Sequence, residues 1–160
     1  MQQEGMVHAL SEIRRVLVPN GILIDLRPVD DERPIEVYSA RETMQTGFTT
    51  YLPHGKDDYL AANQAMLTIE SRGWFIRETE ENFPLHYVWD TPKEMEEWIE
   101  TEWEDFIELD EETKQATRSA WTLGDGDSRV RVRVKMLITR WRKQVNVGRP
   151  PINRQGEGYD

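Results

Sequence analysis

Four basic residues alternate with apolar ones near the end of the chain, at Arg129, Arg131, Arg133 and Lys135. Alternate residues of a β-strand point to the same face, so these charges would line one face of a single strand. Such a strand suits phosphate contacts, but no aromatic residues for base stacking are interleaved with the charges. We therefore expect the bases to face the acidic helices of 92–112, in the same chain or a neighbour. A nucleic-acid-associated module that uses 129–135 is the alternative.

Carboxylates are densest in residues 93–112, which hold eleven acids and one lysine. Clustered carboxylates bind hard cations, but no Asp-x-Asp-x-Asp-Gly loop is present, so we expect a solvated helix face. The histidines His8, His54 and His86 share no metal-ligand spacing, and no metal site is expected. His86 is expected to be buried or to lie in a cleft, without a role as a catalytic base.

The common catalytic and cofactor motifs are absent. The sequence contains no Gly-x-Gly-x-x-Gly, Walker loop, Gly-x-Ser-x-Gly or His-Glu-x-x-His. No catalytic, cofactor-binding or metal-binding residue is therefore assigned from motifs, and whether the protein is an enzyme stays open. The six tryptophans are expected in the core or at an interface, with Trp98 in the core beside Met95.

Composition narrows the class of protein further. The 160 residues include 30 acids and 20 bases, for a net charge of -10, which argues against nucleic acid as a partner. There is no cysteine, which excludes disulfides and thiolate zinc sites. No apolar run approaches the roughly 18 residues of a membrane span, and the N-terminus lacks a signal pattern. We expect a cytoplasmic protein with no membrane contact.

Two helix–turn–strand units are predicted from the apolar spacing. Residues 6–17 form an amphipathic helix that ends at Pro19-Asn20-Gly21, and the apolar run 22–26 suits a strand covered on both faces, as in a parallel sheet. A second helix over 58–72, capped by Asp57 or Asp58, ends at a glycine and leads into a strand at 74–76. This order of elements is typical of an α/β layer fold.

The other elements are predicted from local signals. Short strands are predicted at 35–37 and 48–52, and an alternating strand at 83–89 that Pro84 restricts to an edge. Thr91 and Glu94 predict a capping box, and Asp110 caps a further helix to about 121. The alternation over 129–138 is the clearest strand signal. We predict one domain over 1–143 and a flexible tail over 144–160.

One segment resembles a known family. Residues 8–28 read His-Ala-Leu-Ser-Glu-Ile-Arg-Arg-Val-Leu-Val-Pro-Asn-Gly-Ile-Leu-Ile-Asp-Leu-Arg-Pro. They resemble class I S-adenosylmethionine-dependent methyltransferases, in which a helix ends in Arg-Val-Leu-x-Pro-Gly-Gly and feeds the fifth strand. Asn20 replaces the first glycine, and asparagine tolerates positive φ. The resemblance implies the C-terminal half of a Rossmann-like domain, with a mixed sheet, a final antiparallel strand at 129–141 and a helical insertion at 92–121.

The same resemblance implies what is missing. In that family S-adenosylmethionine sits on a glycine-rich loop after the first strand and an acid after the second, and both precede the helix seen here at 6–17. No cofactor-binding residue is carried over. The resemblance therefore implies a partial domain that does not methylate alone, or one that a partner chain completes. Asp25 and Arg27, at the carboxyl end of the strand, are the weak candidates for the substrate side.

Assembly is predicted from the strand at 22–26. Without a fourth strand beside it, Ile22, Leu23, Ile24 and Leu26 form an apolar strand with one unpaired edge. We expect two chains to pair these edges as a homodimer. The competing outcome is that 35–39 or 48–52 covers the edge within one chain.

Overall fold

The structure is a computed structural model that describes residues 3–29 and 31–145. Most of the predicted tail, from 146 onward, therefore lies outside the described residues. The described part contains four helices and six strands. In chain order they are α1 (Gln3–Val16), β1 (Ile22–Pro28), β2 (Arg33–Tyr38), β3 (Thr43–Tyr51), α2 (Pro53–Ser71), β4 (Phe75–Trp89), α3 (Pro92–Glu102), β5 (Ile107–Glu108), α4 (Glu111–Leu123) and β6 (Arg129–Lys143).

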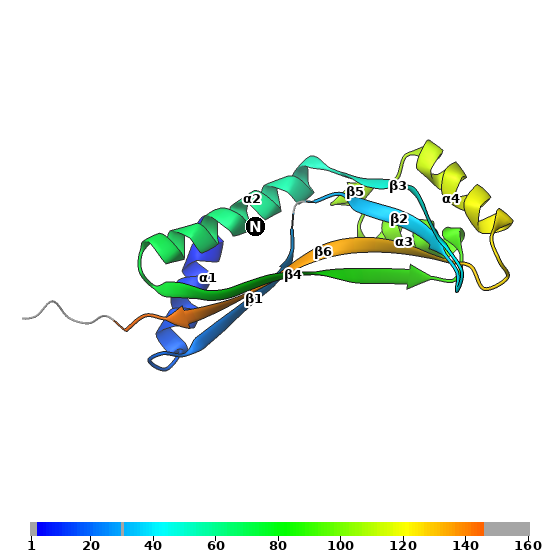
Figure 1. The fold of residues 1–160 in the computed structure, drawn as a ribbon. Coiled ribbons are helices and arrows are strands. Elements are labelled where there is room, and N and C mark those ends of the chain that lie inside the picture. The colour runs from blue at the N-terminus through cyan, green and yellow to red at the C-terminus, as the bar shows by residue number, and fades with distance from the viewer. Residues whose placement is uncertain (1–2, 30, 146–160) are drawn as a thin grey trace, which may run out of the picture.

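The long strand β6 organises the sheet. Along one side it pairs with β4 over nearly its whole length, and along the other it pairs with β1 and then β2 (Figure 1). β3 follows β2, and β5 follows β3. Every one of these pairings is antiparallel. The α/β class is thus confirmed, but the mixed sheet with parallel neighbours is wrong, because β1, β2 and β4, which run the same way, each pair with β6 and not with one another.

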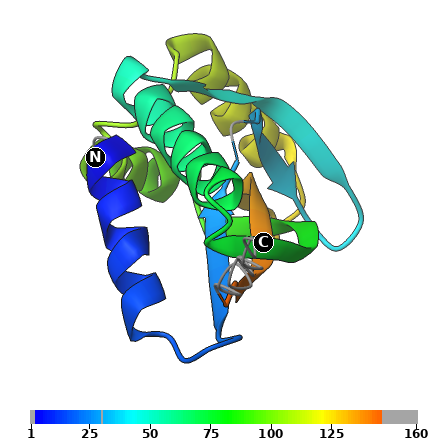
Figure 2. The same cartoon turned by 90° about the vertical axis from the view of Figure 1, so that its left-hand side faces the viewer.

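Helices cover opposite faces of the two halves of β6. In its first half the buried residues are Val130, Val132 and Val134, which pack with Met95 and Ile99 of α3. In its second half the buried residues change parity to Leu137, Thr139 and Trp141, and Trp141 packs with Met66, Ile69 and Phe75. Successive strand residues point to opposite faces, so the two cores lie on opposite sides of the sheet. Figure 1 shows α1 and α2 at one end of the sheet and α3 and α4 at the other, and Figure 2 views the sheet from the end that carries α1 and α2.

Two helix–turn–strand units enter this sheet as predicted. Asn20 has φ 60° in the turn between α1 and β1, the left-handed conformation expected of it. Gly73 has φ 64° after α2 and precedes β4. The α2 boundary differs from the prediction: the helix begins at Pro53 with Leu52 as the N-cap, so neither Asp57 nor Asp58 caps it. Proline suits the first turn of a helix and sets the earlier start.

The insertion between β4 and β6 follows its local signals. Thr91 and Glu94 form the predicted capping box of α3, and the Asp110 carboxylate accepts the Thr113 N–H at 2.6 Å at the start of α4. The segments 74–76 and 83–89, predicted as separate strands, lie in the single strand β4 except for Trp74, which precedes it. Among the described strands β4 pairs only with β6, so Pro84 lies on an edge strand as predicted. Within 3–29 and 31–145, no helix is long and apolar enough to span a membrane.

Candidate functional site

The strand β1 has one partner and one open edge in the described part of the chain. Its register with β6 sets Ile22 opposite Arg142 and Pro28 opposite Met136. At the two ends of this ladder, Lys143 N–H donates to the Gly21 carbonyl at 2.8 Å and Val29 N–H donates to the Lys135 carbonyl at 3.0 Å. Hydrogen-bonded and non-hydrogen-bonded pairs alternate along an antiparallel ladder. The odd residues 21–29 therefore bond to β6, and the N–H groups of Ile22, Ile24 and Leu26 point to the open edge.

The side chains of β1 also leave one face open. Ile22, Ile24 and Leu26 are exposed, with Ile24 at 53%, whereas Leu23 is partly buried against the core beneath α1 and α2. The expectation of a strand covered on both faces is thus wrong. The helices that precede β1 and β4 pack on the same side of the sheet, so the even-numbered residues face outward without a cover. Strands β2 and β3 lie along the first half of β6 and do not pair with β1.

Asp25 and Arg27 lie at the carboxyl end of β1, on the side of the sheet that α2 covers. Arg27 Nε lies 3.0 Å from Asp25 Oδ2, and Arg27 Nη1 donates to Asn63 Oδ1 of α2 at 2.5 Å. Both side chains are less than one-fifth exposed. The pair is therefore held in place by α2 instead of being freely solvated at the strand end.

A cavity of about 460 Å³ opens beside Arg27 at this end of β1, and we call it the Arg33 cavity. It is lined by Arg27, Pro28, Arg33, Tyr51, Gly55, Asp58, Tyr59, Ala62, Glu102, Trp103 and Phe106. The wall of the cavity thus includes residues from five elements: β1, β2, β3, α2 and α3. At Gly55 a β-carbon would lie 2.8 Å from the Phe106 carbonyl oxygen, so only glycine lets the start of α2 approach this closely.

Arg33 is the most buried charged group of that cavity, at 8% exposure. Its guanidinium carbon lies 4.8 Å from the Tyr51 ring centroid and 5.4 Å from that of Trp103, and Nη2 donates to the Tyr59 hydroxyl. The Tyr51 and Tyr59 hydroxyls are 3.3 Å apart. Burial, and then the hydrogen bond with Tyr59, raise the pKa of Tyr51 well above its usual range, so its hydroxyl stays protonated.

This cluster was not predicted from the sequence. Arg33 lies outside the strands predicted from the sequence, and its neighbours in space are ordinary aromatic residues far apart along the chain. The one local signal is that Arg33 directly precedes Pro34 at the start of an apolar strand. Because Arg33 is the first residue of this strand, its side chain lies on one face of the sheet.

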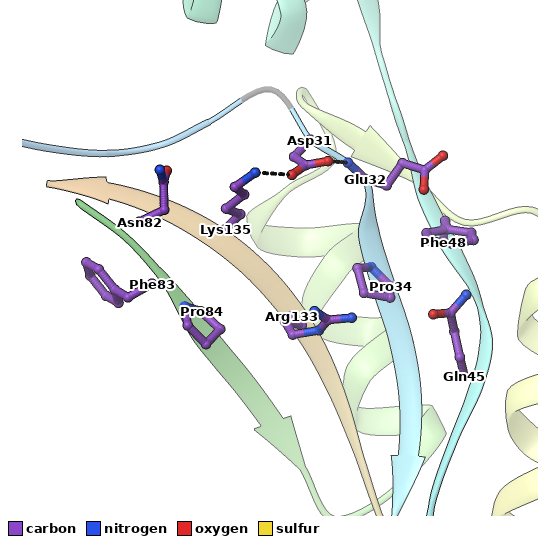
Figure 3. Close-up of a pocket in the computed structure, with 10 residues that line it drawn as sticks. All are labelled: Asp31, Glu32, Pro34, Gln45, Phe48, Asn82, Phe83, Pro84, Arg133 and Lys135. Atoms are coloured by element: carbon purple, nitrogen blue, oxygen red, sulfur yellow. Dashed lines mark hydrogen bonds and ion pairs between the residues drawn. The ribbon is translucent and has the colours of Figure 1, made fainter. Parts of the chain in front are cut away.

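A second hollow, the sheet hollow, lies on the other side of the loop before β2 (Figure 3). Lys135 of β6 reaches the Asp31 carboxylate at 2.9 Å, and Arg133 points towards β2, where its Nη2 lies 3.4 Å from Glu36. The hydrogen bond from Lys135, and then that from the Glu32 N–H, lower the pKa of Asp31. The bases of this hollow already have acidic partners.

The basic face of β6 is neutralised within the chain. Arg131 Nε lies 2.7 Å from Glu36, and Arg129 Nε lies 3.2 Å from Asp90. The predicted partners, the acidic helices of 92–112, are therefore wrong. Those helices cover the apolar face of β6, whereas the bases point to the other face and meet β2 and the loops.

The acids of the insertion are mostly exposed, as predicted, with one exception. Glu96 is buried and accepts two hydrogen bonds from Arg118, and Glu100 lies 2.9 Å from Lys114. His86 is exposed on β4, so its predicted burial is wrong, because its face of β4 has no helix over it. Among the described residues, no group of three or more His, Asp or Glu is placed to hold a metal ion.

The chain was compared with protein-family models, with curated proteins and with solved structures. No family model, curated protein or solved structure matches it. Any assignment of function therefore rests on the residues and their geometry.

Proposed function

We propose that this chain is a methyltransferase-like partial domain that does not transfer methyl groups alone. The observation that carries the proposal is the arrangement β1–β6–β4, in which two strands that run the same way, each preceded by a helix, flank a final antiparallel strand. The resemblance of 8–28 implies two helix–strand units and a final antiparallel strand at the end of a methyltransferase-like domain. The insertion of α3, β5 and α4 between β4 and β6 also fits it.

The open edge of β1 supports the second part of the proposal. In the family pattern another strand lies beside this one, and here three backbone N–H groups point outward with no described strand to accept them. The 160 residues contain no Gly-x-Gly-x-x-Gly motif, and no residue is assigned to S-adenosylmethionine. The absence of cysteine is compatible with a cytoplasmic location, which we include in the proposal.

A second copy of this chain is the proposed occupant of the open edge. A two-fold axis at Ile24 sets Ile24 opposite Ile24 and Ile22 opposite Leu26 of the second copy. This register satisfies all three outward N–H groups of each copy and keeps the two Asp25 carboxylates from facing each other. The exposed side chains of Ile22, Ile24 and Leu26 then form apolar cross-strand pairs. A partner protein that carries a glycine-rich loop is the competing occupant.

Calorimetric titration of the purified chain with S-adenosylmethionine tests the functional proposal. We expect no saturable heat in the micromolar range, because the chain lacks the residues that the resemblance assigns to the cofactor. Micromolar binding would overturn the proposal. A pull-down that recovers, in stoichiometric amount, a protein with a glycine-rich loop would favour the hypothesis of a two-chain enzyme over that of a homodimer.

The nucleic-acid alternative finds no support in the geometry. A phosphate-binding strand needs unpaired cations, whereas Arg129, Arg131, Arg133 and Lys135 each lie within ion-pair distance of an acid.

A further inference from the structure

Arg33 is a buried cation that no described carboxylate neutralises. None forms an ion pair with it within 3–29 and 31–145, unlike Arg118, Arg131 or Arg142, each of which contacts a glutamate. Its Nε is also buried without a hydrogen-bond partner. Burial of a charge is costly unless the charge is paired and hydrogen-bonded. In the part of the chain that the structure describes, nothing therefore supplies a negatively charged acceptor at this position.

The aromatic rings around Arg33 do not supply that acceptor. Contacts with the faces of Tyr51 and Trp103 stabilise the positive charge. They do not satisfy the N–H groups, of which a guanidinium has five, and Nη2 donates to the neutral hydroxyl of Tyr59. A carboxylate presents two oxygens in the geometry that a guanidinium edge donates to. Because Arg33 lines the Arg33 cavity, its guanidinium is the donor that such a carboxylate would meet.

The walls of the Arg33 cavity indicate the rest of the ligand. Pro28, Tyr59, Ala62 and Phe106 provide apolar surface, and a volume of about 460 Å³ lies within the range of small-molecule sites. Among the charged groups of the wall, Arg27 is neutralised by Asp25, and Glu102 is an exposed acid. The negative charge of Glu102 disfavours a dianion such as phosphate and leaves a monoanion as the better match for Arg33.

We propose that the Arg33 cavity binds a small organic carboxylate with a flat apolar body. The carboxylate accepts hydrogen bonds from the Arg33 guanidinium, and the body packs against the aromatic wall. This inference is independent of the proposed function, because it uses only residues of this chain and no part of the methyltransferase resemblance. Titration with S-adenosylmethionine therefore does not decide it.

The test is a titration of the wild-type chain with benzoate, observed by NMR at the Nε–Hε signals of arginine. We expect a saturable shift of the Arg33 signal, no comparable shift with benzamide, and weaker binding of inorganic phosphate. Arg33→Gln should weaken benzoate binding at least tenfold. Arg131→Gln is the matched control, since Arg131 is also partly buried and has its own glutamate, and it should leave benzoate binding unchanged.

Each contrary result overturns the proposal. Absence of a saturable Arg33 shift with benzoate shows that the cavity takes no carboxylate, and equal binding of benzamide shows an apolar cavity only. Tighter binding of phosphate shows a general oxyanion site. The titration of the wild-type chain tests the proposal even if Arg33→Gln fails to fold. The variant Tyr59→Phe keeps the ring and frees a further N–H of Arg33, so it should retain benzoate binding.

Discussion

The substitution Ile24→Pro should separate pairing between chains from pairing within one chain. The Ile24 N–H points away from β6 and its side chain is exposed, so proline removes no hydrogen bond of the β1–β6 ladder. Proline is tolerated on an edge strand when its nitrogen faces outward. We expect the free energy of unfolding to fall by about 1 kcal/mol or less.

The same substitution lies at the centre of the proposed dimer. With Ile24 opposite Ile24, proline removes two hydrogen bonds between the chains and places two rings against the pairing edge. At about 0.5–1.5 kcal/mol for each hydrogen bond, the dissociation constant should rise by roughly 5- to 150-fold. Steric exclusion by the rings adds to this loss.

Leu23→Pro is the matched control one position earlier. The Leu23 N–H bonds to β6 and its side chain contacts the core under α1 and α2. Loss of this N–H leaves a carbonyl of β6 without a donor, and the missing hydrogen bond alone should lower the free energy of unfolding by about 1–3 kcal/mol. Urea denaturation measures both variants, and sedimentation equilibrium at tens of micromolar measures the dimer. A monomeric wild-type chain, or a folded Ile24→Pro chain with an unchanged dissociation constant, refutes the edge-paired dimer.

Three other features of the molecule give testable outcomes. Thr91→Ala removes the capping box of α3 and should lower the free energy of unfolding, measured by urea denaturation, by about 1 kcal/mol. Thr101→Ala, at an exposed position of the same helix, is the control and should lower it less. An equal decrease for the two variants would contradict the role of the cap. The hydrogen bond from Arg142 is the main cause that lowers the pKa of Glu78. The ionised Glu78 therefore stabilises the fold above its ordinary pKa of 4.5, and this stabilisation is lost as the pH falls through the lowered pKa. The Tm of the Glu78→Gln chain should fall less steeply with decreasing pH than that of the wild-type chain, and parallel curves of Tm against pH for the two chains would refute this. A gel shift at about 50 mM salt should show no binding of DNA or RNA, and a retarded band would restore the nucleic-acid alternative.

Elements with strong local signals were predicted well from the sequence. The turn at Asn20, the glycine after α2 and the cap at Thr91 each impose a backbone conformation that depends on a few neighbouring residues. The alternation of Val130, Val132 and Val134 marks one face of β6 whatever its partners are. These features do not depend on long-range packing, so one sequence suffices to find them.

Pairing and burial were predicted less well because they depend on distant residues. The apolar run of β1 indicated a strand, but it does not encode the direction of the neighbouring strand or which face a helix covers. The acid that neutralises Arg131 is Glu36, 95 residues earlier in the chain, whereas the acidic helices are much closer in sequence. The Arg33 cavity draws its wall from five elements, and only Arg27 and Pro28 of its residues belong to the segment that resembles a known family.

Hydrogen exchange at single residues of β1 tests the central claim most directly, because the proposed function depends on an edge that is open within one chain. At low micromolar concentration we expect slow exchange at Leu23, Asp25 and Arg27 and fast exchange at Ile22, Ile24 and Leu26. The three fast amides should become protected as the concentration rises and the edges pair. Equal protection of all six amides at high dilution would show that the edge is covered within the chain and would contradict the proposal.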